Sequence, residues 1–198
     1  MVYIIEALSH NHLLKPGDQI AIATPIFTPY LQIPSVKDYG LVSIDVSTTA
    51  EENWDIPEAE LAKLEDPSVK SFFLVNLSNP ASHALSENTP ARLAQVVEKN
   101  PDMIILTDDV YGTFAKDFQS VYAVLPYNTI LVYSFSKHYG ITGWRIGLIA
   151  MNEQCSATDC SVSCRRQIRP VCATSTPSSQ PIPTACPSWT GWWRTAAP

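Results

Sequence analysis

Five short runs of apolar residues, separated by segments with helical periodicity, constrain the fold of this 198-residue chain most strongly. Several runs are apolar almost throughout, which is typical of strands in a parallel sheet whose two faces are both covered. Parallel strands also need crossover connections of the kind that the intervening helical patterns supply. The sequence therefore predicts an α/β fold, with a mostly parallel sheet flanked by helices. The predicted strands are residues 19–23, 41–46, 71–77, 103–108 and 129–134.

The two clearest helical segments are residues 57–65 and 89–100. The first, PEAELAKLE, carries apolar residues at helical spacing. The second begins TPARLAQVV, which predicts Thr89 as its N-cap and Pro90 at the first helical position. The stretch SHNH at residues 9–12 is predicted to end an earlier helix.

Composition excludes several classes of protein. The chain is 45% hydrophobic and 16% charged, as is typical of a globular domain. Its net charge of −6 and its lack of a lysine-rich run argue against a nucleic-acid partner. No stretch approaches the roughly 20 apolar residues of a membrane span, so we expect no membrane association. The first residues lack the basic start and cleavage site of a signal peptide, which indicates a cytoplasmic location.

The composition changes near residue 151. All five cysteines lie within residues 155–198, and no histidine follows His138. An odd number of clustered cysteines fits no disulfide framework, and a zinc site would need paired ligand spacings, so we expect no metal site. We predict a partial large domain at residues 1–151 and an irregular tail at residues 152–198. A Pro/Ser-rich disordered tail is one interpretation; we favour translation out of frame, because a one-base shift turns WTGWWRTA into an ordinary helical sequence.

Polar residues follow three of the predicted strands. Asn79 lies in NLSNPAS, Asp108 and Tyr111 in TDDVYGTF, and Lys137 in YSFSKHYGITGWRIG. The carboxyl ends of parallel strands meet at one edge of a sheet, which is where open α/β sheets bind ligands. Taken singly, each residue is equally compatible with a turn, a helix cap or a solvated lysine. Their order along the chain is more specific.

That order resembles the fold-type-I pyridoxal-phosphate enzymes, the aspartate aminotransferase superfamily. The matching elements are Asn-Pro, Asp-x-x-Tyr and Ser-x-Ser-Lys-x-x-Gly-x-x-Gly-x-Arg-x-Gly. TPIFTPY, with Pro25, Phe27 and Tyr30, is similar to the segment that places a ring against the cofactor. The resemblance covers about residues 13–151. Within the superfamily it is nearest to the bacterial aspartate 4-decarboxylases, which also transaminate aspartate.

The resemblance implies pyridoxal 5'-phosphate as the cofactor. Lys137 would bond to the cofactor aldehyde and, once displaced, act as the catalytic base at the substrate α-carbon. Gly140 and Gly143 are expected to let the chain turn back toward this lysine. Six further residues are implied to bind the cofactor: Asp108 at the pyridine nitrogen, Tyr111 and Asn79 at the phenolic oxygen, Phe27 on the ring face, and Ser134 and Arg145 at the phosphate.

The resemblance also implies the partners: an amino-acid substrate, with aspartate favoured, a 2-oxo acid, and a second copy of the chain in a homo-oligomer. Members of the superfamily usually carry an upstream Gly/Ser/Thr-rich phosphate loop and a downstream arginine for the substrate carboxylate. This sequence has neither motif, so we expect a truncated member of the superfamily. Two alternatives stay open. The chain derives from a class I aminotransferase with a different amino-acid substrate, or it is a non-catalytic fragment.

Overall fold

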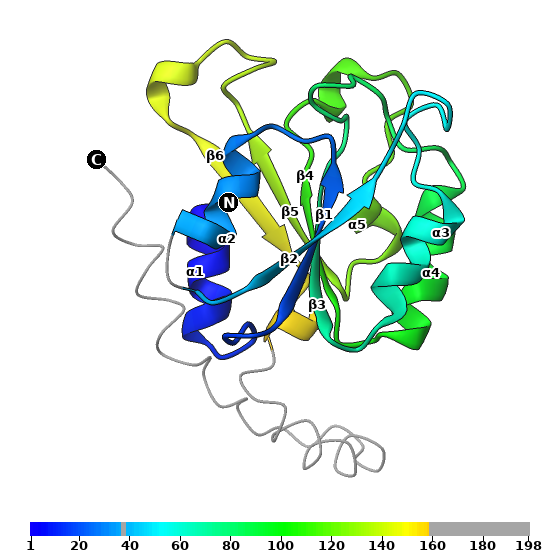
Figure 1. The fold of residues 1–198 in the computed structure, drawn as a ribbon. Coiled ribbons are helices and arrows are strands. Elements are labelled where there is room, and N and C mark those ends of the chain that lie inside the picture. Colours follow the sequence, from blue (N-terminus) through cyan, green and yellow to red (C-terminus); the bar gives the residue numbers. More distant parts are fainter. Residues whose placement is uncertain (37–38, 159–198) are drawn as a thin grey trace, which may run out of the picture. The chain divides into compact units, whose positions relative to one another are not determined.

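The computed structural model describes residues 1–36 and 39–158, which form a single sheet with helices on both faces (Figure 1). The strand order is β2-β1-β3-β4-β5-β6. The first five strands in the chain pair in parallel, and β6 runs antiparallel to β5. The strands are β1 (Gln19–Thr24), β2 (Val42–Ser47), β3 (Val69–Val75), β4 (Ile104–Asp108), β5 (Thr129–Ser134) and β6 (Gly147–Met151).

The predicted mostly parallel α/β sheet is confirmed, and each of the five predicted strands is present with ends within two residues of the prediction. The sixth strand was not predicted. Its residues follow a glycine-punctuated turn, and its register with β5 runs from Ser134 opposite Gly147 to Ile130 opposite Met151. The chain therefore reverses between β5 and β6, which brings the start of β6 back to the carboxyl end of β5.

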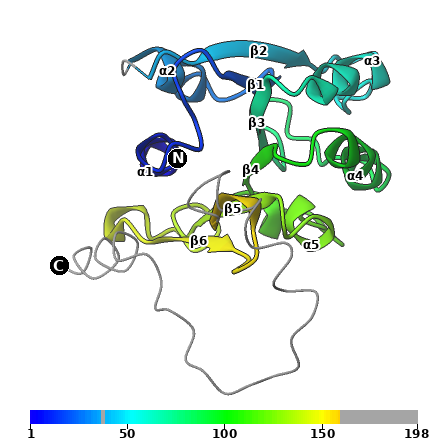
Figure 2. The same ribbon diagram turned by 90° about the horizontal axis from the view of Figure 1, so that it is seen from below.

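Helices cover the two faces of the sheet unequally. Figure 2 places α1 and α2 on one face and α3, α4 and α5 on the other.

Among the described residues, no helix is long and apolar enough to cross a membrane. The α-helices are α1 (Val2–His10), α2 (Pro29–Val36), α3 (Glu58–Leu61), α4 (Thr89–Lys99) and α5 (Val121–Val124); the 3-10 turns are η1 (Ala62–Glu65), η2 (Gly112–Phe114), η3 (Thr142–Trp144) and η4 (Ser156–Thr158).

Side chains alternate between two buried clusters along each central strand. In β3, Phe73 and Val75 join the cluster that contains Ile5 of α1, whereas Phe72 and Leu74 join the cluster that contains Leu93 of α4. Successive side chains of a strand point to opposite faces, so a strand covered on both sides is apolar at most of its positions. This double burial explains why the central strands lack a polar alternation.

The buried core continues beyond the predicted domain boundary at residue 151. Cys155 and Ala157 are 1% and 2% exposed and belong to the cluster on the α1 face. The boundary itself and the origin of the tail stay predictions, because residues 159–198 lie outside the described residues.

The N-terminus of α4 differs from its prediction by one residue. Asn88, not Thr89, is the N-cap, and its side chain makes no capping hydrogen bond. Thr89 is fully buried, and its hydroxyl donates to Asp55 Oδ1 at 2.6 Å. A buried hydroxyl needs a hydrogen-bond partner, and here that partner comes from the loop before α3 rather than from the helix itself. Pro90 was predicted at the first helical position and is instead the second residue of the helix, within its first turn.

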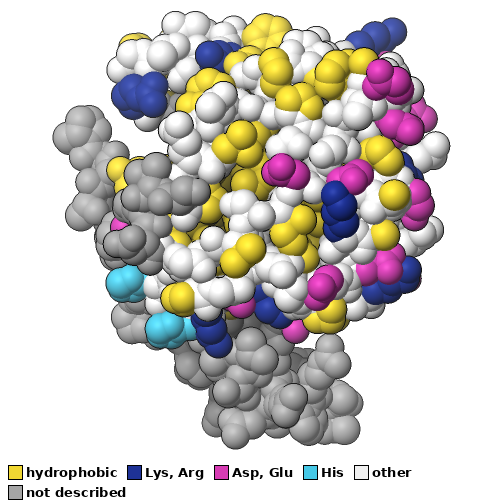
Figure 3. Space-filling model, viewed as in Figure 1, with side chains coloured by type: hydrophobic (Ala, Val, Ile, Leu, Met, Phe, Trp, Pro, Cys, Tyr) yellow, Lys and Arg dark blue, Asp and Glu magenta, His cyan; other side chains and the backbone are white. Residues whose placement is uncertain are grey.

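Charged side chains gather over α3 and α4, at the right of Figure 3. They form exposed or partly exposed ion pairs, each worth less than about 1 kcal/mol in general. The apolar clusters, rather than these pairs, therefore hold α3 and α4 on the sheet. The pairs are Lys63–Glu60, Arg92–Glu58 and Lys99–Glu65, with N–O distances of 2.6, 3.0 and 2.7 Å.

Asn100 fastens the C-terminal end of α4 to the chain that enters β3. It is 3% exposed, and its Nδ2 lies 3.0 Å from the carbonyl oxygen of Leu64, 3.1 Å from that of Asp66 and 2.9 Å from that of Val69. Three backbone carbonyls, two of them in buried residues, thus depend on one amide group.

We expect Asn100→Asp to lower the free energy of unfolding by about 2–4 kcal/mol, because it replaces the donor with an acceptor that faces three carbonyls. Urea denaturation followed by circular dichroism measures this loss. Asn88→Ala is the matched control, since its exposed side chain makes no capping bond, and its effect should stay within about 0.5 kcal/mol. Equal losses in the two variants would contradict this role of Asn100.

Candidate active site

The carboxyl ends of the central strands bring the predicted site residues to one edge of the sheet. Asp108 is in register with Val75 of β3 and Val132 of β5, so the segments that follow these strands lie side by side. Because β6 is antiparallel, the residues just before it return to the same edge. The predicted residues at or just beyond this edge are Phe27, Asn79, Asp108, Tyr111, Ser134, Lys137 and Arg145.

Asp108 is the buried acid of this edge. Its side chain is 5% exposed; the Tyr30 hydroxyl donates to Oδ2 at 2.6 Å, and the Val110 backbone N–H donates to Oδ1 at 3.1 Å. Burial raises the pKa of Asp108 above its ordinary value, and the two hydrogen bonds oppose that rise. Burial, together with the neighbouring Asp108 charge, also raises the pKa of Tyr30, so the phenol stays neutral. The pair can hold a cationic group against a buried carboxylate.

Lys137 lies beside Tyr111 above this edge. Its Nζ is 5.9 Å from the centroid of the Tyr111 ring, within the range of a cation–π contact. Tyr111 is partly buried, whereas Lys137 is exposed. In the part of the chain that the structure describes, Lys137 forms no ion pair. The amine is therefore placed next to the Asp-x-x-Tyr segment without a carboxylate to hold it.

The loop between β5 and β6 closes on itself and carries Lys137 and Arg145 on its two limbs. The Phe135 N–H donates to the Ile146 carbonyl at 3.2 Å, and the Thr142 hydroxyl donates to the Ser136 carbonyl at 2.9 Å. Arg145 is exposed, adopts a φ of +54°, and places Nη1 3.4 Å from the Thr142 carbonyl.

Only one of the two glycines expected to turn this loop has a conformation that calls for glycine. Gly140 has a φ of +66°, in the left-handed region that side chains disfavour. At Gly143 the φ lies outside that region, and an added β-carbon would meet no atom within 4 Å. The expected backbone role of Gly143 is therefore wrong, and the turn depends on Gly140.

The remaining predicted residues surround the same edge. Phe27 is 48% exposed, and its ring packs edge-on against Tyr30 with centroids 5.6 Å apart. Asn79 is partly buried, and the bond to Pro80 is cis. The Ser134 hydroxyl accepts a hydrogen bond from the Ser136 N–H at 3.2 Å. An exposed aromatic face, an amide and a hydroxyl thus lie around the acid and the amine.

A second acid at the end of β4 was not singled out from the sequence. Asp109 is 4% exposed, and the Thr107 hydroxyl donates to its Oδ1 at 2.5 Å. Burial raises the pKa of Asp109 to about 6; hydrogen bonds from Ser120 and Thr107 oppose the rise, and the Asp108 charge adds to it. The sequence did offer a signal for this second acid, the adjacent Asp108-Asp109 pair at a strand end. Successive side chains of a strand face opposite sides of the sheet, so two adjacent acids there cannot both face the site.

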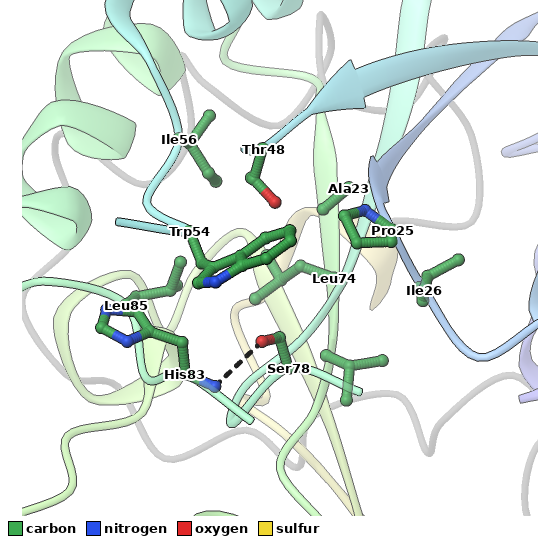
Figure 4. A pocket seen from close by; sticks show the side chains of 11 residues that line it. Ala23, Pro25, Ile26, Thr48, Trp54, Ile56, Leu74, Ser78, His83 and Leu85 are labelled. Carbon is green, nitrogen blue, oxygen red and sulfur yellow. Dashed lines mark hydrogen bonds between the residues drawn. The ribbon is translucent and has the colours of Figure 1, made fainter. Parts of the chain in front are cut away.

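A separate small hollow lies beyond the ends of β1 and β3 (Figure 4). Its walls include Pro25, Trp54, Leu74 and His83, and the indole of Trp54 lies across it. The His83 backbone N–H donates to the Ser78 hydroxyl at 3.2 Å. The hollow offers about 20 Å³, space for roughly one water, so it is no cofactor site.

A family model described as class I and II aminotransferases matches residues 4–186. That match covers most of the chain, so the chain belongs to this family, whose members depend on pyridoxal phosphate. The expected superfamily and its cofactor are confirmed.

Two of the relatives that it matches are aminotransferases of bacteria. The bifunctional aspartate aminotransferase and L-aspartate beta-decarboxylase of Pseudomonas sp is 50% identical over 154 residues, which are 77% of this chain and 29% of that protein. A probable aspartate/prephenate aminotransferase of Rhizobium leguminosarum bv. phaseoli is 34% identical over 143 residues, 69% of this chain and 35% of that protein. The chain thus spans about a third of the length of these relatives.

Solved structures agree on the fold. An aspartate aminotransferase double mutant from Thermus thermophilus superposes with a TM-score of 0.67 at 22% identity, over 84% of this chain and 43% of that one. Cystalysin from Treponema denticola, whose structure contains a pyridoxal 5'-phosphate cofactor, gives a TM-score of 0.66 at 19% identity, over 79% of this chain and 42% of that one. At these identities the comparison supports the architecture alone.

The residues at the edge fit pyridoxal phosphate by their chemistry. The buried Asp108 carboxylate suits a protonated ring nitrogen, and the half-exposed Phe27 ring suits an aromatic face. Lys137 would offer an amine to the aldehyde, and Ser134 and Arg145 would offer a hydroxyl and a guanidinium to the phosphate.

The raised pKa of Asp109 predicts a pH-dependent loss of stability. The folded carboxyl keeps its proton up to about pH 6, whereas the unfolded one releases it near 3.8. The folded state binds more protons within this interval, so the free energy of unfolding falls as pH rises through it, by up to about 3 kcal/mol.

Asp109→Asn removes the ionisation and keeps an oxygen for the Thr107 hydroxyl. We expect little difference from the parent protein at pH 4 and a higher free energy of unfolding by about 1–3 kcal/mol at pH 7. Urea titrations at a series of pH values measure it, with Asp117→Asn at an exposed position as the control for the same chemical change. A constant offset at all pH values would contradict the assignment to Asp109.

Proposed function

We propose that this chain forms the cofactor-binding part of an enzyme that converts L-aspartate, both by transamination and by release of the 4-carboxylate as CO2 to give alanine. The 50% identity to a bifunctional aspartate aminotransferase and beta-decarboxylase supports the substrate and both reactions. The observation that carries the proposal is the amine of Lys137, 5.9 Å from the Tyr111 ring at the edge where Asp108 is buried. An amino acid and a 2-oxo acid are the proposed small-molecule partners, and a homo-oligomer is the proposed assembly.

Bound pyridoxal phosphate would supply an aldehyde that captures amino groups and a protonated ring that accepts electrons from the substrate α-carbon. Lys137 would hold the aldehyde through Nζ and, once released, move a proton at that α-carbon. Asp108 would hold the proton at the ring nitrogen, because a buried carboxylate favours a cation beside it. Tyr111 and Asn79 would donate to the phenolic oxygen, and Phe27 would cover a ring face.

Ser134 and Arg145 are the proposed phosphate ligands. The 3.4 Å contact between Arg145 Nη1 and the Thr142 carbonyl is long for a hydrogen bond, so the guanidinium can turn away from it toward an anion. A guanidinium can then donate to two phosphate oxygens at once. The closed loop keeps this group on the limb opposite Lys137.

Two other functions are carried as alternatives. The 34% identity to a probable aspartate/prephenate aminotransferase supports a class I aminotransferase with a different substrate, and no described side chain selects the fate of the 4-carboxylate. The exposure of Lys137 and Arg145 supports a non-catalytic fragment that binds the cofactor weakly.

Addition of pyridoxal phosphate to the purified chain is expected to give the visible absorption band of a lysine–pyridoxal adduct. Lys137→Ala should lose the band, and borohydride reduction should mark only Lys137 in a peptide map. Lys99→Ala is the matched control, because that exposed lysine pairs with Glu65 on α4 and should leave the band unchanged. An absorption band that persists in Lys137→Ala would contradict the assignment of Lys137 as the residue that bonds to pyridoxal phosphate.

Incubation of the cofactor-loaded chain with L-aspartate and a 2-oxo acid distinguishes the three functions. Alanine with CO2, in addition to oxaloacetate, is the expected result. Oxaloacetate alone would replace decarboxylation with simple transamination. No product in the presence of a normal absorption band would identify a non-catalytic fragment.

A further inference from the structure

Tyr30 connects α2 to the buried acid of the site. Its hydroxyl donates to Asp108 Oδ2 at 2.6 Å across 78 positions of sequence. Its ring packs edge-on against Phe73 of the core, with centroids 4.8 Å apart, and against the half-exposed Phe27. One ring therefore has three contacts: a core side chain, the acid, and the aromatic face that lies open at the site.

The two oxygens of Asp108 have separate donors. Oδ1 accepts from the Val110 backbone N–H, which is fixed by the strand end, and Oδ2 accepts from Tyr30. Two donors on opposite oxygens define the rotation of the carboxyl group. A hydroxyl also stabilises the ionised carboxylate without adding a positive charge, so it does not compete electrostatically with a cationic ligand.

Four titratable groups act on Asp108 or on its phenol partner. Burial disfavours its charge, the amino group of Met1 and the Tyr30 hydroxyl favour it, and Asp109 lies beside it on the strand. Tyr111 acts on Tyr30 electrostatically. Among these groups Tyr30 makes the short side-chain hydrogen bond, so it is the one whose removal changes both the orientation and the ionisation of the acid.

We propose that Tyr30 is a positioning residue: its hydroxyl holds the Asp108 carboxylate in the orientation that receives a protonated ring nitrogen, while its ring places Phe27 beside that ligand. This inference rests on the proposed cofactor site and adds to it a residue outside the set that the resemblance assigns to the cofactor. It also makes α2 part of the site, although this helix contributes no cofactor-binding residue.

Tyr30→Phe tests the proposal because it keeps the ring contacts with Phe73 and Phe27 and removes only the hydroxyl. Carbon-13 NMR titration of the Asp108 carboxyl in the chain without cofactor should show a higher pKa in the variant. Pyridoxal-phosphate affinity should fall about tenfold, as is typical of a lost hydrogen bond to a charged group. The amino group of Met1 is common to both proteins and cancels in the comparison.

Phe27→Leu is the matched control. It removes the stacking face, so it should weaken pyridoxal-phosphate binding and leave the Asp108 titration unchanged. An unchanged Asp108 titration in Tyr30→Phe, with only a lower unfolding midpoint, would mean that Tyr30 is purely structural and would overturn the proposal.

Site-specific 3-fluorotyrosine at position 30 provides the second test if Tyr30→Phe does not fold. The fluorinated phenol is a stronger donor, so the Asp108 pKa should move down instead of up; no movement would also overturn the proposal. The titrations need no cofactor, so they decide the role of Tyr30 toward Asp108 even if the absorption experiment with Lys137→Ala fails.

Discussion

The parallel register of β3, β4 and β5 is the constraint on which the candidate site depends. It sets Asp108 level with Val75 and Val132, so three connecting segments leave the sheet at the same height. Side chains of a strand alternate between faces, so a slip of one residue in β4 would exchange Asp108 with Asp109. Asp108 would then face α4 and α5, and its hydrogen bond with Tyr30 would be lost.

The carboxyl groups of Asp108 and Asp109, at the end of β4, are both buried but differ in their hydrogen-bond donors, and this difference suits them to different roles. Burial raises the pKa of both. Asp108 receives a phenol and a backbone N–H on its two oxygens, which suits a group that stays ionised opposite a cation. Asp109 has the Thr107 hydroxyl and the repulsion of Asp108, so it is better suited to keeping a proton. A single strand end thus supplies one acid to the site and one to the interior.

Features that depend on neighbours in sequence were predictable, and features that depend on distant contacts were not. The strands were recognisable because burial on both faces makes them apolar throughout, and the order of the Asn-Pro, Asp-x-x-Tyr and lysine motifs placed the site at their carboxyl ends. The β6 strand was missed because it is a short strand whose first residues are exposed, so it is not buried on both faces as the central strands are. Thr89 was misplaced because its hydroxyl binds Asp55, and the contact of Tyr30 with Asp108 spans 78 positions.

The reversal between β5 and β6 has a consequence for the order in which the molecule matures. The site draws on residues from Phe27 to Arg145, and Arg145 reaches the edge only when β6 has paired with β5. Parallel pairings close long stretches of chain and therefore form slowly. Lys137 follows Tyr30 and Asp108 in the chain, so an aldehyde ligand can meet the complete candidate site only after β5 and β6 have paired.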